Sequence, residues 1–237
     1  LSWTSTENVR TGTGPDLRLL PAIIGGDQKN RHGVVLAKSI PAKAFGIVTG
    51  EPVATAFKKC PTLQMAAPDH HLYHAYSQRL MTLLESFCPY LEQLSIDECF
   101  LDMGRRGYRR EHAQALAEEI RAEVRKLGFT VNVGISSRKV LAKMASDFQK
   151  PDKTHTLFPE EIKEKMWPLP VGERYMAGHS SVTTLHMLGI LTIGDLARSD
   201  RSLIESHLKS HGTLLWEYAN GIDDRPVITE EPEAKGI

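Results

Sequence analysis

The sequence predicts an α+β fold, in which helices cover one face of a sheet, followed by a wholly helical segment. In the middle of the chain, apolar residues at helical spacing alternate with short runs typical of strands. Their order is β–α–β–α with antiparallel hairpins, which is that of an α+β layer. From about Pro159 the predicted elements shorten and are all helical. The 237 residues suffice for one large domain or for two to three small ones.

The first part of the chain, from Leu1 to about Ala67, is predicted to contain short elements separated by turns. Glycine, proline and asparagine recur there between brief apolar runs, as is typical of strand ends and tight links. The expected elements are strands at 21–27 and 34–37, linked through 30–33, and short helices at 42–45 and 52–60, the second closed by Pro61.

Longer elements are predicted in the middle of the chain. Asp69 is expected to cap a long amphipathic helix, which Pro89 stops. The next elements are a helix over about 113–127 ended by Gly128, an alternating strand over 129–135, and a helix capped by Ser136 or Ser137 and ended by Pro151.

The composition is that of a globular protein, with 41% hydrophobic and 24% charged residues. No apolar run approaches the length of a membrane span, and the first residues do not form a signal sequence. The three cysteines have no metal-like spacing and are interpreted as reduced thiols, which predicts a cytoplasmic location. The formal net charge of zero argues mildly against strong DNA binding by this segment alone.

Two adjacent carboxylates, Asp97 and Glu98, lie between strand-like stretches in residues 93–103. Neighbouring anions at a strand turn repel each other, and a divalent cation removes that repulsion. Mg²⁺ is typically held by one or two carboxylates plus substrate phosphates, so the first hypothesis is phosphoryl or nucleotidyl transfer. The alternative is a pair of exposed turn acids. Asp102 is a further acid on the same hairpin, and the pattern does not decide its role.

Two lysine-bearing segments are candidates for binding a phosphate. Lys150 lies just past the helix that is predicted to begin at Ser136 or Ser137, where a lysine can reach a triphosphate as a compact point charge. Near residue 41 a proline-initiated helix would leave free backbone N–H groups beside Ser39 and Lys43. The alternatives are a solvated lysine that helps the helix dipole and an ordinary helix start.

The helical segment contains a stretch that resembles a helix–hairpin–helix. Such a motif brings backbone N–H groups of a glycine-lined turn to DNA phosphates without reading sequence. The second glycine of the usual turn is Ser180 here, and a hairpin that only packs is the alternative. The candidate DNA-binding residues are Gly178, His179, Ser180 and Ser181, in two short helices over 178–196 joined through Gly189-Ile190 and followed by helices at 202–208 and 214–220.

Taken together, these motifs resemble the Y-family, or translesion, DNA polymerases of the UmuC/DinB type. SIDECFLD resembles the family's palm motif, and VGISSRKVLAKMASDFQKP resembles the segment that carries its phosphate-binding lysine. SIPAKAFGIVTGEP resembles the fingers motif, and LGILTIGDLA and WEYANGIDDRPV resemble the thumb. The matches stand in the family's order and cover nearly the whole chain.

The resemblance implies a right-hand polymerase core that acts on primer–template DNA and dNTPs with two Mg²⁺ ions. Asp97 would bridge both ions and Glu98 would bind the one that activates the primer hydroxyl. Lys43 and Lys150 would hold the triphosphate. The implied domains are fingers over 1–67, with at most a remnant of the first palm strand, a palm over 68–157, a helix–hairpin–helix thumb over 158–229, and a linker from 230 to 237.

The chain also departs from the family's pattern. The third metal carboxylate would lie a few residues before Leu1, and the little-finger domain would follow Ile237. The fingers tyrosine is Ile40 here, and the fingers arginine is Lys43, which keeps the charge but loses the bidentate fork. The full-length protein is therefore expected to be a polymerase, and this fragment is expected to be inactive or nearly so.

Two other functions stay open on the sequence. One is a polymerase-derived accessory protein in DNA repair, which docks DNA or a sliding clamp without catalysis. The other is a different phosphoryl-transfer enzyme on a palm-like sheet, such as a nucleotidyl cyclase, against which the thumb motif argues. In the family, clamp-binding peptides generally lie beyond the region covered here.

Overall fold

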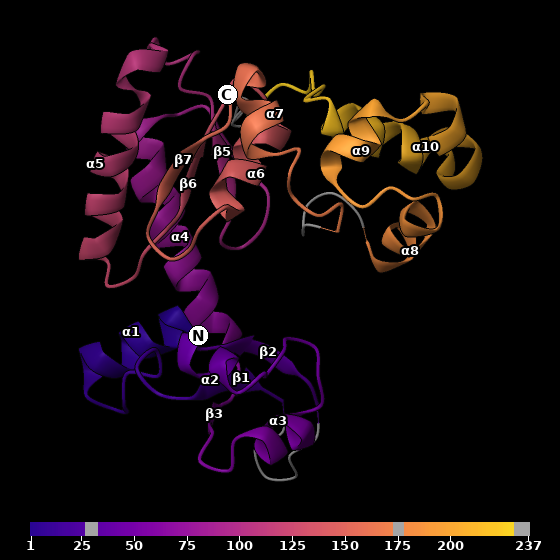
Figure 1. Ribbon diagram of the computed structural model, residues 1–237. Helices are drawn as coiled ribbons and strands as arrows, with labels where there is room; N and C mark the ends of the chain where they lie inside the picture. Colours follow the sequence, from indigo (N-terminus) through magenta and orange to yellow (C-terminus); the bar gives the residue numbers. More distant parts are fainter. Residues whose placement is uncertain (27–32, 173–177, 230–237) are drawn as a thin grey trace, which may run out of the picture. The chain divides into compact units, whose positions relative to one another are not determined.

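The computed structural model describes residues 1–26, 33–172 and 178–229 and divides into two compact units. The first unit contains residues 1–83, 94–98 and 126–129. The second contains residues 84–93, 99–125 and those from 130 onward. Figure 1 shows helices and strands in both units, and the predicted α+β class is confirmed. Among the described residues, no helix has both the length and the apolar character needed to cross a bilayer.

The first unit is built on a three-stranded sheet in the order β2-β1-β3. The central strand β1 pairs antiparallel with β2 and parallel with β3. Successive side chains of a strand point to opposite faces, and β1 is buried on both. Ile23 joins one apolar cluster, whereas Ala22 and Ile24 join another. The strands are β1 (Ala22–Gly25), β2 (Val35–Lys38) and β3 (Gln64–Ala66).

Short helices surround this sheet, and the long helix α4 (His70–Phe87) begins in the same unit. Asp69 caps α4 as predicted, because its carboxylate accepts the N–H of Leu72 at 2.9 Å. Tyr76 on α4 stacks on Trp3 with ring centroids 6.2 Å apart. The short helices are α1 (Ser2–Thr11), α2 (Ile40–Ala44) and α3 (Val53–Lys59).

The second unit contains two strand pairs. Strands β4 (Leu91–Gln93) and β5 (Cys99–Leu101) are antiparallel, and β6 (Val133–Ile135) and β7 (Thr154–Thr156) are parallel. Parallel neighbours need a crossover connection, and α6 (Lys139–Asp147) supplies it here.

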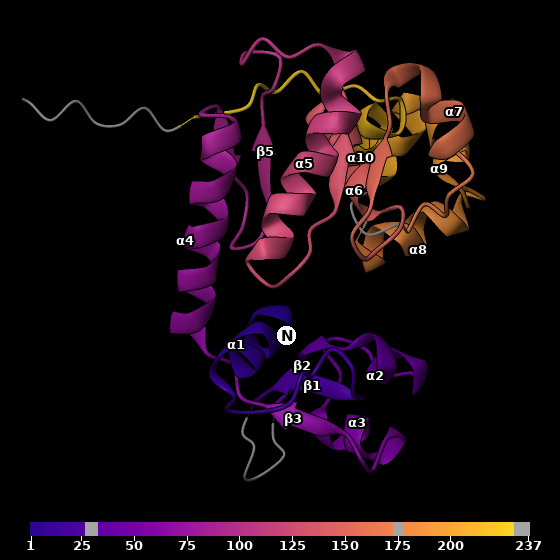
Figure 2. The same ribbon diagram turned by 90° about the vertical axis from the view of Figure 1, so that its left-hand side faces the viewer.

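Helices α5 (Ala113–Lys126) and α6 lie on opposite faces of the β6–β7 pair (Figures 1 and 2). Gly134 faces α6, because a Cβ there would meet the backbone of that helix. Gly134 is paired with His155 on β7. Thr154, the residue before His155, points to the opposite face, where its hydroxyl accepts a hydrogen bond from Arg121 of α5 at 3.3 Å. The sequence predicted helices on one face of a sheet; at this pair the missing side chain of Gly134 leaves room for a helix on the second face as well.

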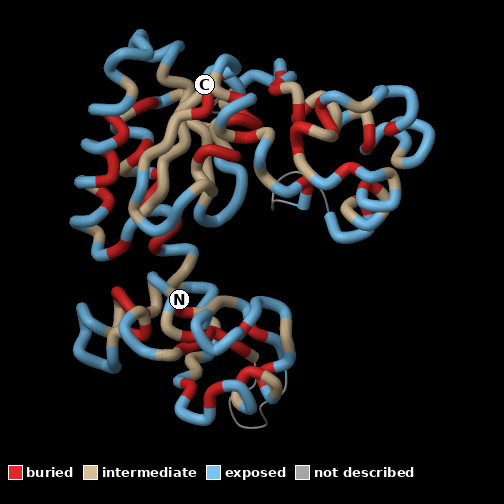
Figure 3. Tube along the Cα trace, in the orientation of Figure 1, coloured by how far each residue is buried: buried red, intermediate tan, exposed pale blue. Residues whose placement is uncertain are grey.

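The elements described after β7 are all helices, as predicted. One apolar core runs from α6 to α10 and appears in Figure 3 as buried stretches of the tube. Lys209 has φ 56° and interrupts α10, which agrees with the two helices predicted there. The elements are η1 (Arg110–His112) before α5, then η2 (Pro159–Glu161), α7 (Ile162–Lys165), α8 (His179–Met187), α9 (Ile193–Arg198) and α10 (Arg201–Ala219).

Two local predictions are wrong. The strand expected over 129–135 begins only at Val133, since Phe129 instead packs edge-on against Trp3 at 5.9 Å in the first unit. Neither Ser136 nor Ser137 caps α6, and the Ser136 hydroxyl donates to the Leu157 carbonyl at 2.6 Å. The link predicted at 30–33 lies outside the described residues except for Gly33.

A buried carboxylate far along the chain replaces the predicted serine cap. Asp223 accepts the N–H of Val140 at 2.9 Å and two hydrogen bonds from Arg225 at 2.7 and 2.9 Å. Nearby, Lys139 pairs with Glu92 at 2.6 Å, and Glu92 also accepts the N–H of Ile228 at 2.7 Å. The segment after α10 is thus fixed to β4 and to the start of α6.

Asp223→Asn is expected to destabilise the protein by about 1–3 kcal/mol at pH 7, because charge-assisted bonds are lost at a buried site. Burial alone would raise the pKa of Asp223, but the bonds from Arg225 and Val140 outweigh burial and hold it below its ordinary value. The stabilisation is therefore present above about pH 3.9 and lost as the pH falls through the lower folded-state pKa.

Urea unfolding at several pH values checks this expectation. The difference between the wild type and Asp223→Asn should narrow as the pH falls below about 4. Asp224→Asn is the matched control, since that side chain is 81% exposed and pairs only at the surface with Arg138. A difference in unfolding free energy between the wild type and Asp223→Asn that stays constant down to about pH 3 would contradict the role given to the Asp223 carboxylate.

Candidate functional site

The Asp97–Glu98 pair lies in the tight turn that joins β4 to β5. The Glu98 carbonyl accepts the N–H groups of Leu94 at 2.8 Å and Ser95 at 3.2 Å, which closes the turn. The Ser77 hydroxyl on α4 donates to the Ile96 carbonyl at 2.5 Å. Turn and helix are therefore held together within the first unit, and this anchor at Ser77 was not predicted from the sequence because its partner is 19 residues away.

The two carboxylates of the turn differ in solvent exposure. Asp97 is exposed and Glu98 is half-buried. The Ser95 hydroxyl donates to Asp97 Oδ1 at 3.1 Å and so limits the orientation of that carboxylate. Adjacent carboxylates supply the hard oxygen ligands that suit Mg²⁺. Within residues 1–26, 33–172 and 178–229, no three His, Cys, Asp or Glu side chains form a metal-binding group.

Asp102 has a structural contact of its own. Its carboxylate accepts the N–H of Arg105 at 3.0 Å in the turn that follows β5. This contact accounts for an acid at position 102, whose role the sequence left undecided.

The two predicted nucleotide-binding residues near α2 differ in environment. Ser39 is buried, donates its hydroxyl proton to the Leu20 carbonyl at 2.7 Å and accepts the N–H groups of Ala22 and Ala42. Its hydroxyl thus caps α2 and joins that helix to β1. Lys43 on α2 is exposed. Of the two side chains, Lys43 is the one whose surroundings suit an anion.

Lys150 lies in the turn between α6 and β7. Its Nζ pairs with Asp147 Oδ1 at 2.6 Å, and its side chain is 48% exposed. Lys143 approaches the same carboxylate at 3.4 Å. Burial alone would raise the pKa of Asp147, but the two lysines outweigh burial and hold it below its ordinary value. Asp147 therefore remains ionised, and its ion pair limits the orientation of the Lys150 side chain.

The predicted DNA-binding residues form the start of α8. Gly178 is the N-cap, His179 and Ser180 are exposed, and Ser181 is buried. The turn before them falls in residues 173–177, which lie outside the described part of the chain. A helix start can bind phosphate through its free backbone N–H groups, so the DNA-binding role of these residues stays a prediction.

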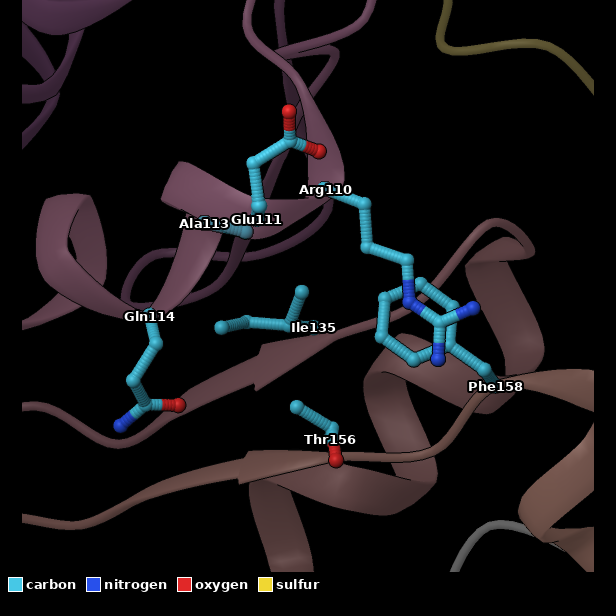
Figure 4. Close-up of a pocket in the computed structure, with 7 residues that line it drawn as sticks. All are labelled: Arg110, Glu111, Ala113, Gln114, Ile135, Thr156 and Phe158. Carbon is cyan, nitrogen blue, oxygen red and sulfur yellow. The ribbon is translucent and has the colours of Figure 1, made fainter.

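A surface cavity of about 440 Å³ lies in the second unit, at one end of β6 and β7 (Figure 4). In the described structure its lining comes from η1, α5, β6, β7 and Phe158 rather than from the predicted site residues. The Arg110 guanidinium lies over the Phe158 ring at 3.5 Å and pairs with Glu160 at 2.5 Å. These residues come from separate segments, so no local sequence pattern could have identified the cavity.

The predicted site residues fall into two groups. Asp97, Glu98, Ser39 and Lys43 belong to the first unit, whereas Lys150 and residues 178–181 belong to the second. A family model described as impB/mucB/samB matches residues 5–147, a range that contains the whole first group. The chain belongs to this family.

Relatives with curated names agree with the family match. The chain is 50% identical to DNA polymerase IV of Clostridium acetobutylicum over 240 residues, covering 100% of this chain and 60% of that protein. It is 37% identical over 220 residues to DNA polymerase IV of Acetivibrio thermocellus, covering 92% of this chain and 55% of that protein. The chain thus spans less than two thirds of the length of these relatives.

Two solved structures share the fold of this chain. DinB from Sulfolobus solfataricus matches with a TM-score of 0.83 and 25% identity, over 96% of this chain and 67% of that chain. A Y-family DNA polymerase chimera matches with a TM-score of 0.84 and 24% identity, over 98% of this chain and 68% of that chain. The resemblance to UmuC/DinB proteins that the sequence motifs predicted is confirmed.

Proposed function

We propose that the protein carrying this chain is a template-directed DNA polymerase of the translesion type, which adds dNTPs to a primer 3′-hydroxyl opposite damaged templates. The observation that carries the proposal is the turn with exposed Asp97 and half-buried Glu98, in a chain that belongs to this family. The names of the relatives support it, since both are DNA polymerases.

The donor set at the turn fits Mg²⁺, because two carboxylates can hold such ions together with substrate phosphates. Asp97 and Glu98 would hold the ions. When bound, the ions would polarise the α-phosphate and make the hydroxyl a stronger nucleophile. The residues of the chain supply the orientation: Ser95 fixes one oxygen of Asp97, and Ser77 holds the turn itself.

Two lysines, Lys43 and Lys150, are the residues that would bind the triphosphate. Lys43 is exposed on α2, and Lys150 is directed by Asp147. Positive charge near the leaving pyrophosphate would stabilise the negative charge that builds up there during transfer. The Ser39 hydroxyl would contribute indirectly, because it caps the helix that bears Lys43.

The domain assignment is part of the same proposal. The proposed domains are fingers over 1–67, a palm over 68–157 and a thumb over 158–229. The linker predicted over 230–237 lies outside the described residues. Small fingers would enclose the new base pair loosely and so tolerate damaged templates. The start of α8 would contact DNA phosphates through backbone N–H groups. Cys60, Cys88 and Cys99 are free thiols, which supports a cytoplasmic location.

Primer extension tests the proposal, with Mg²⁺ and with undamaged and abasic templates. The complete polypeptide that carries this chain should extend both primers. Lys150→Ala should raise the apparent KM for dNTP by about 10- to 100-fold, since a charge-assisted contact is worth about 1.5–3 kcal/mol. Lys153→Ala, an exposed lysine three residues on, is the matched control and should change the KM little.

The outcomes separate the competing functions. Primer–template binding without any extension would favour the non-catalytic DNA-binding protein. Primer extension by Lys150→Ala with an unchanged KM for dNTP would support the polymerase function. It would also show that Lys150 is a surface lysine that pairs with Asp147 and does not bind the triphosphate.

A further inference from the structure

Arg121 is a buried cation that the proposed mechanism does not use. It lies on α5 and is only 8% exposed. Its guanidinium donates to Asp152 Oδ1 at 3.0 Å, to the Asp152 carbonyl, to Glu118 at 2.6 Å and to Thr154 Oγ1 at 3.3 Å. Burying a charge costs free energy that pairing often does not fully offset.

The residue that Arg121 holds has an unusual backbone conformation. Asp152 has φ 57°, in the left-handed region that non-glycine residues rarely adopt. Arg125, one turn further along α5, donates to its second carboxylate oxygen at 2.8 Å. Two arginines on one helix thus bind both the side chain and the carbonyl of Asp152. These contacts keep the chain in a conformation that would otherwise be disfavoured.

Asp152 follows Lys150 by two residues in the turn that connects α6 to β7. At the start of the turn, Lys150 pairs with Asp147, the last residue of α6. At its end, the backbone N–H of Lys153 donates to the Asn132 side chain at 3.1 Å. Between these points the contacts of Arg121 and Arg125 join the turn to α5, the helix on the other face of the β6–β7 pair (Figure 1). The position of Lys150 therefore depends on α5 as well as on α6.

We infer that Arg121, assisted by Arg125, is a positioning residue that sets how the Lys150 ammonium meets the triphosphate. The inference rests on the proposed function, in which Lys150 binds that group. Lysine is a point charge on a flexible stem, so the place of its backbone decides what the ammonium can reach. Misplacing a binding group by about 1 Å can cost about 100-fold in rate. Arg121 touches no reacting atom and acts through the turn.

A double-mutant cycle in the complete polypeptide tests this coupling. Arg121→Met should raise the apparent KM for dNTP about 5- to 20-fold while the Kd for primer–template changes less than about twofold. In the Lys150→Ala background the same substitution should have almost no further effect on the KM, because the group it positions is gone. Arg109→Met, at an arginine whose side chain is 80% exposed, controls for loss of positive charge.

Two more variants keep the test valid if Arg121→Met fails to fold. Arg125→Met removes one contact to Asp152 from a side chain that is 43% exposed, and it should raise the KM by a smaller factor. Arg121→Lys keeps the charge but loses the fork that binds both side chain and carbonyl, and it should restore the KM only partly.

The results distinguish a failure of the positioning role of Arg121 from a failure of the proposed role of Lys150. Equal effects of Arg121→Met with and without Lys150 would overturn the inference, since they would show that Arg121 acts on stability or on DNA. An effect of Lys150→Ala with none from Arg121→Met or Arg125→Met would also overturn it, and the proposed function would stand. If Lys150→Ala itself leaves the dNTP KM unchanged, the proposed role of Lys150 fails and the positioning role fails with it.

Discussion

Asp97→Asn should abolish primer extension in the complete polypeptide that carries this chain. The substitution keeps the size of the side chain and removes the negative charge that would hold the metal ions. Metal ions supply several kcal/mol of charge stabilisation, and each increment of about 1.4 kcal/mol is a factor of ten, so the rate should fall about a thousandfold or more. Single-turnover extension with saturating dNTP measures the loss. Glu98→Gln should behave similarly.

The turn itself should survive this change. Asp97 is exposed, and the hydrogen bonds that close the turn come from the backbone of Glu98 and from Ser77. The Tm of Asp97→Asn should therefore stay close to that of the wild type. Asp102→Asn is the matched control on the same hairpin, because that carboxylate accepts the Arg105 N–H and faces a different turn. It should keep most of the activity.

Two results would contradict the metal-site assignment. One is wild-type extension by Asp97→Asn at limiting Mg²⁺. The other is an equal loss of primer extension in Asp102→Asn with a normal Tm, which would indicate that the metal site lies nearer the turn after β5. A loss that is confined to Asp97 and Glu98, with primer–template binding intact, would support both the site and the polymerase function.

The sequence predicted those elements whose determinants are close together along the chain. Helix α4 follows from apolar spacing, a cap at Asp69 and a stop at Pro89, all within one short stretch. The interruption of α10 near Lys209 is likewise local. The strand over 129–135 was predicted too long because alternation does not show that Phe129 packs against Trp3, which lies far away in the sequence.

Long-range contacts explain what the sequence could not show at the candidate site. The cap of α6 comes from Asp223, 83 residues after its partner Val140, so local preference pointed to the nearby serines instead. The link from Arg121 to Asp152 spans 31 residues and has no motif. The site residues themselves were predicted from short motifs, whereas the contacts that support them come from other elements.

Gly134→Ala should destabilise the protein more than Asp223→Asn does. Gly134 lies on β6 against α6, and a Cβ there would overlap the carbonyl oxygen of Ala142 and approach the Ser146 nitrogen to 2.6 Å. Both clashing atoms belong to the backbone, so a change of side-chain rotamer cannot relieve the overlap. The helix must shift, and we expect the free energy of unfolding to fall by at least about 3 kcal/mol. Urea unfolding measures the change.

Gly172→Ala gives the same chemical change without the clash. A Cβ there would come no closer than 3.4 Å to the Val182 side chain, which is ordinary contact. At a compatible position this substitution stabilises a protein by about 0.4–1 kcal/mol, because it lowers the entropy of the unfolded chain. That entropic effect is common to both variants, so the difference between them isolates the steric cost at Gly134. Equal stabilities would mean that α6 can move away from β6 at little cost, and α6 could not then hold Asp147 and Lys150 in fixed positions.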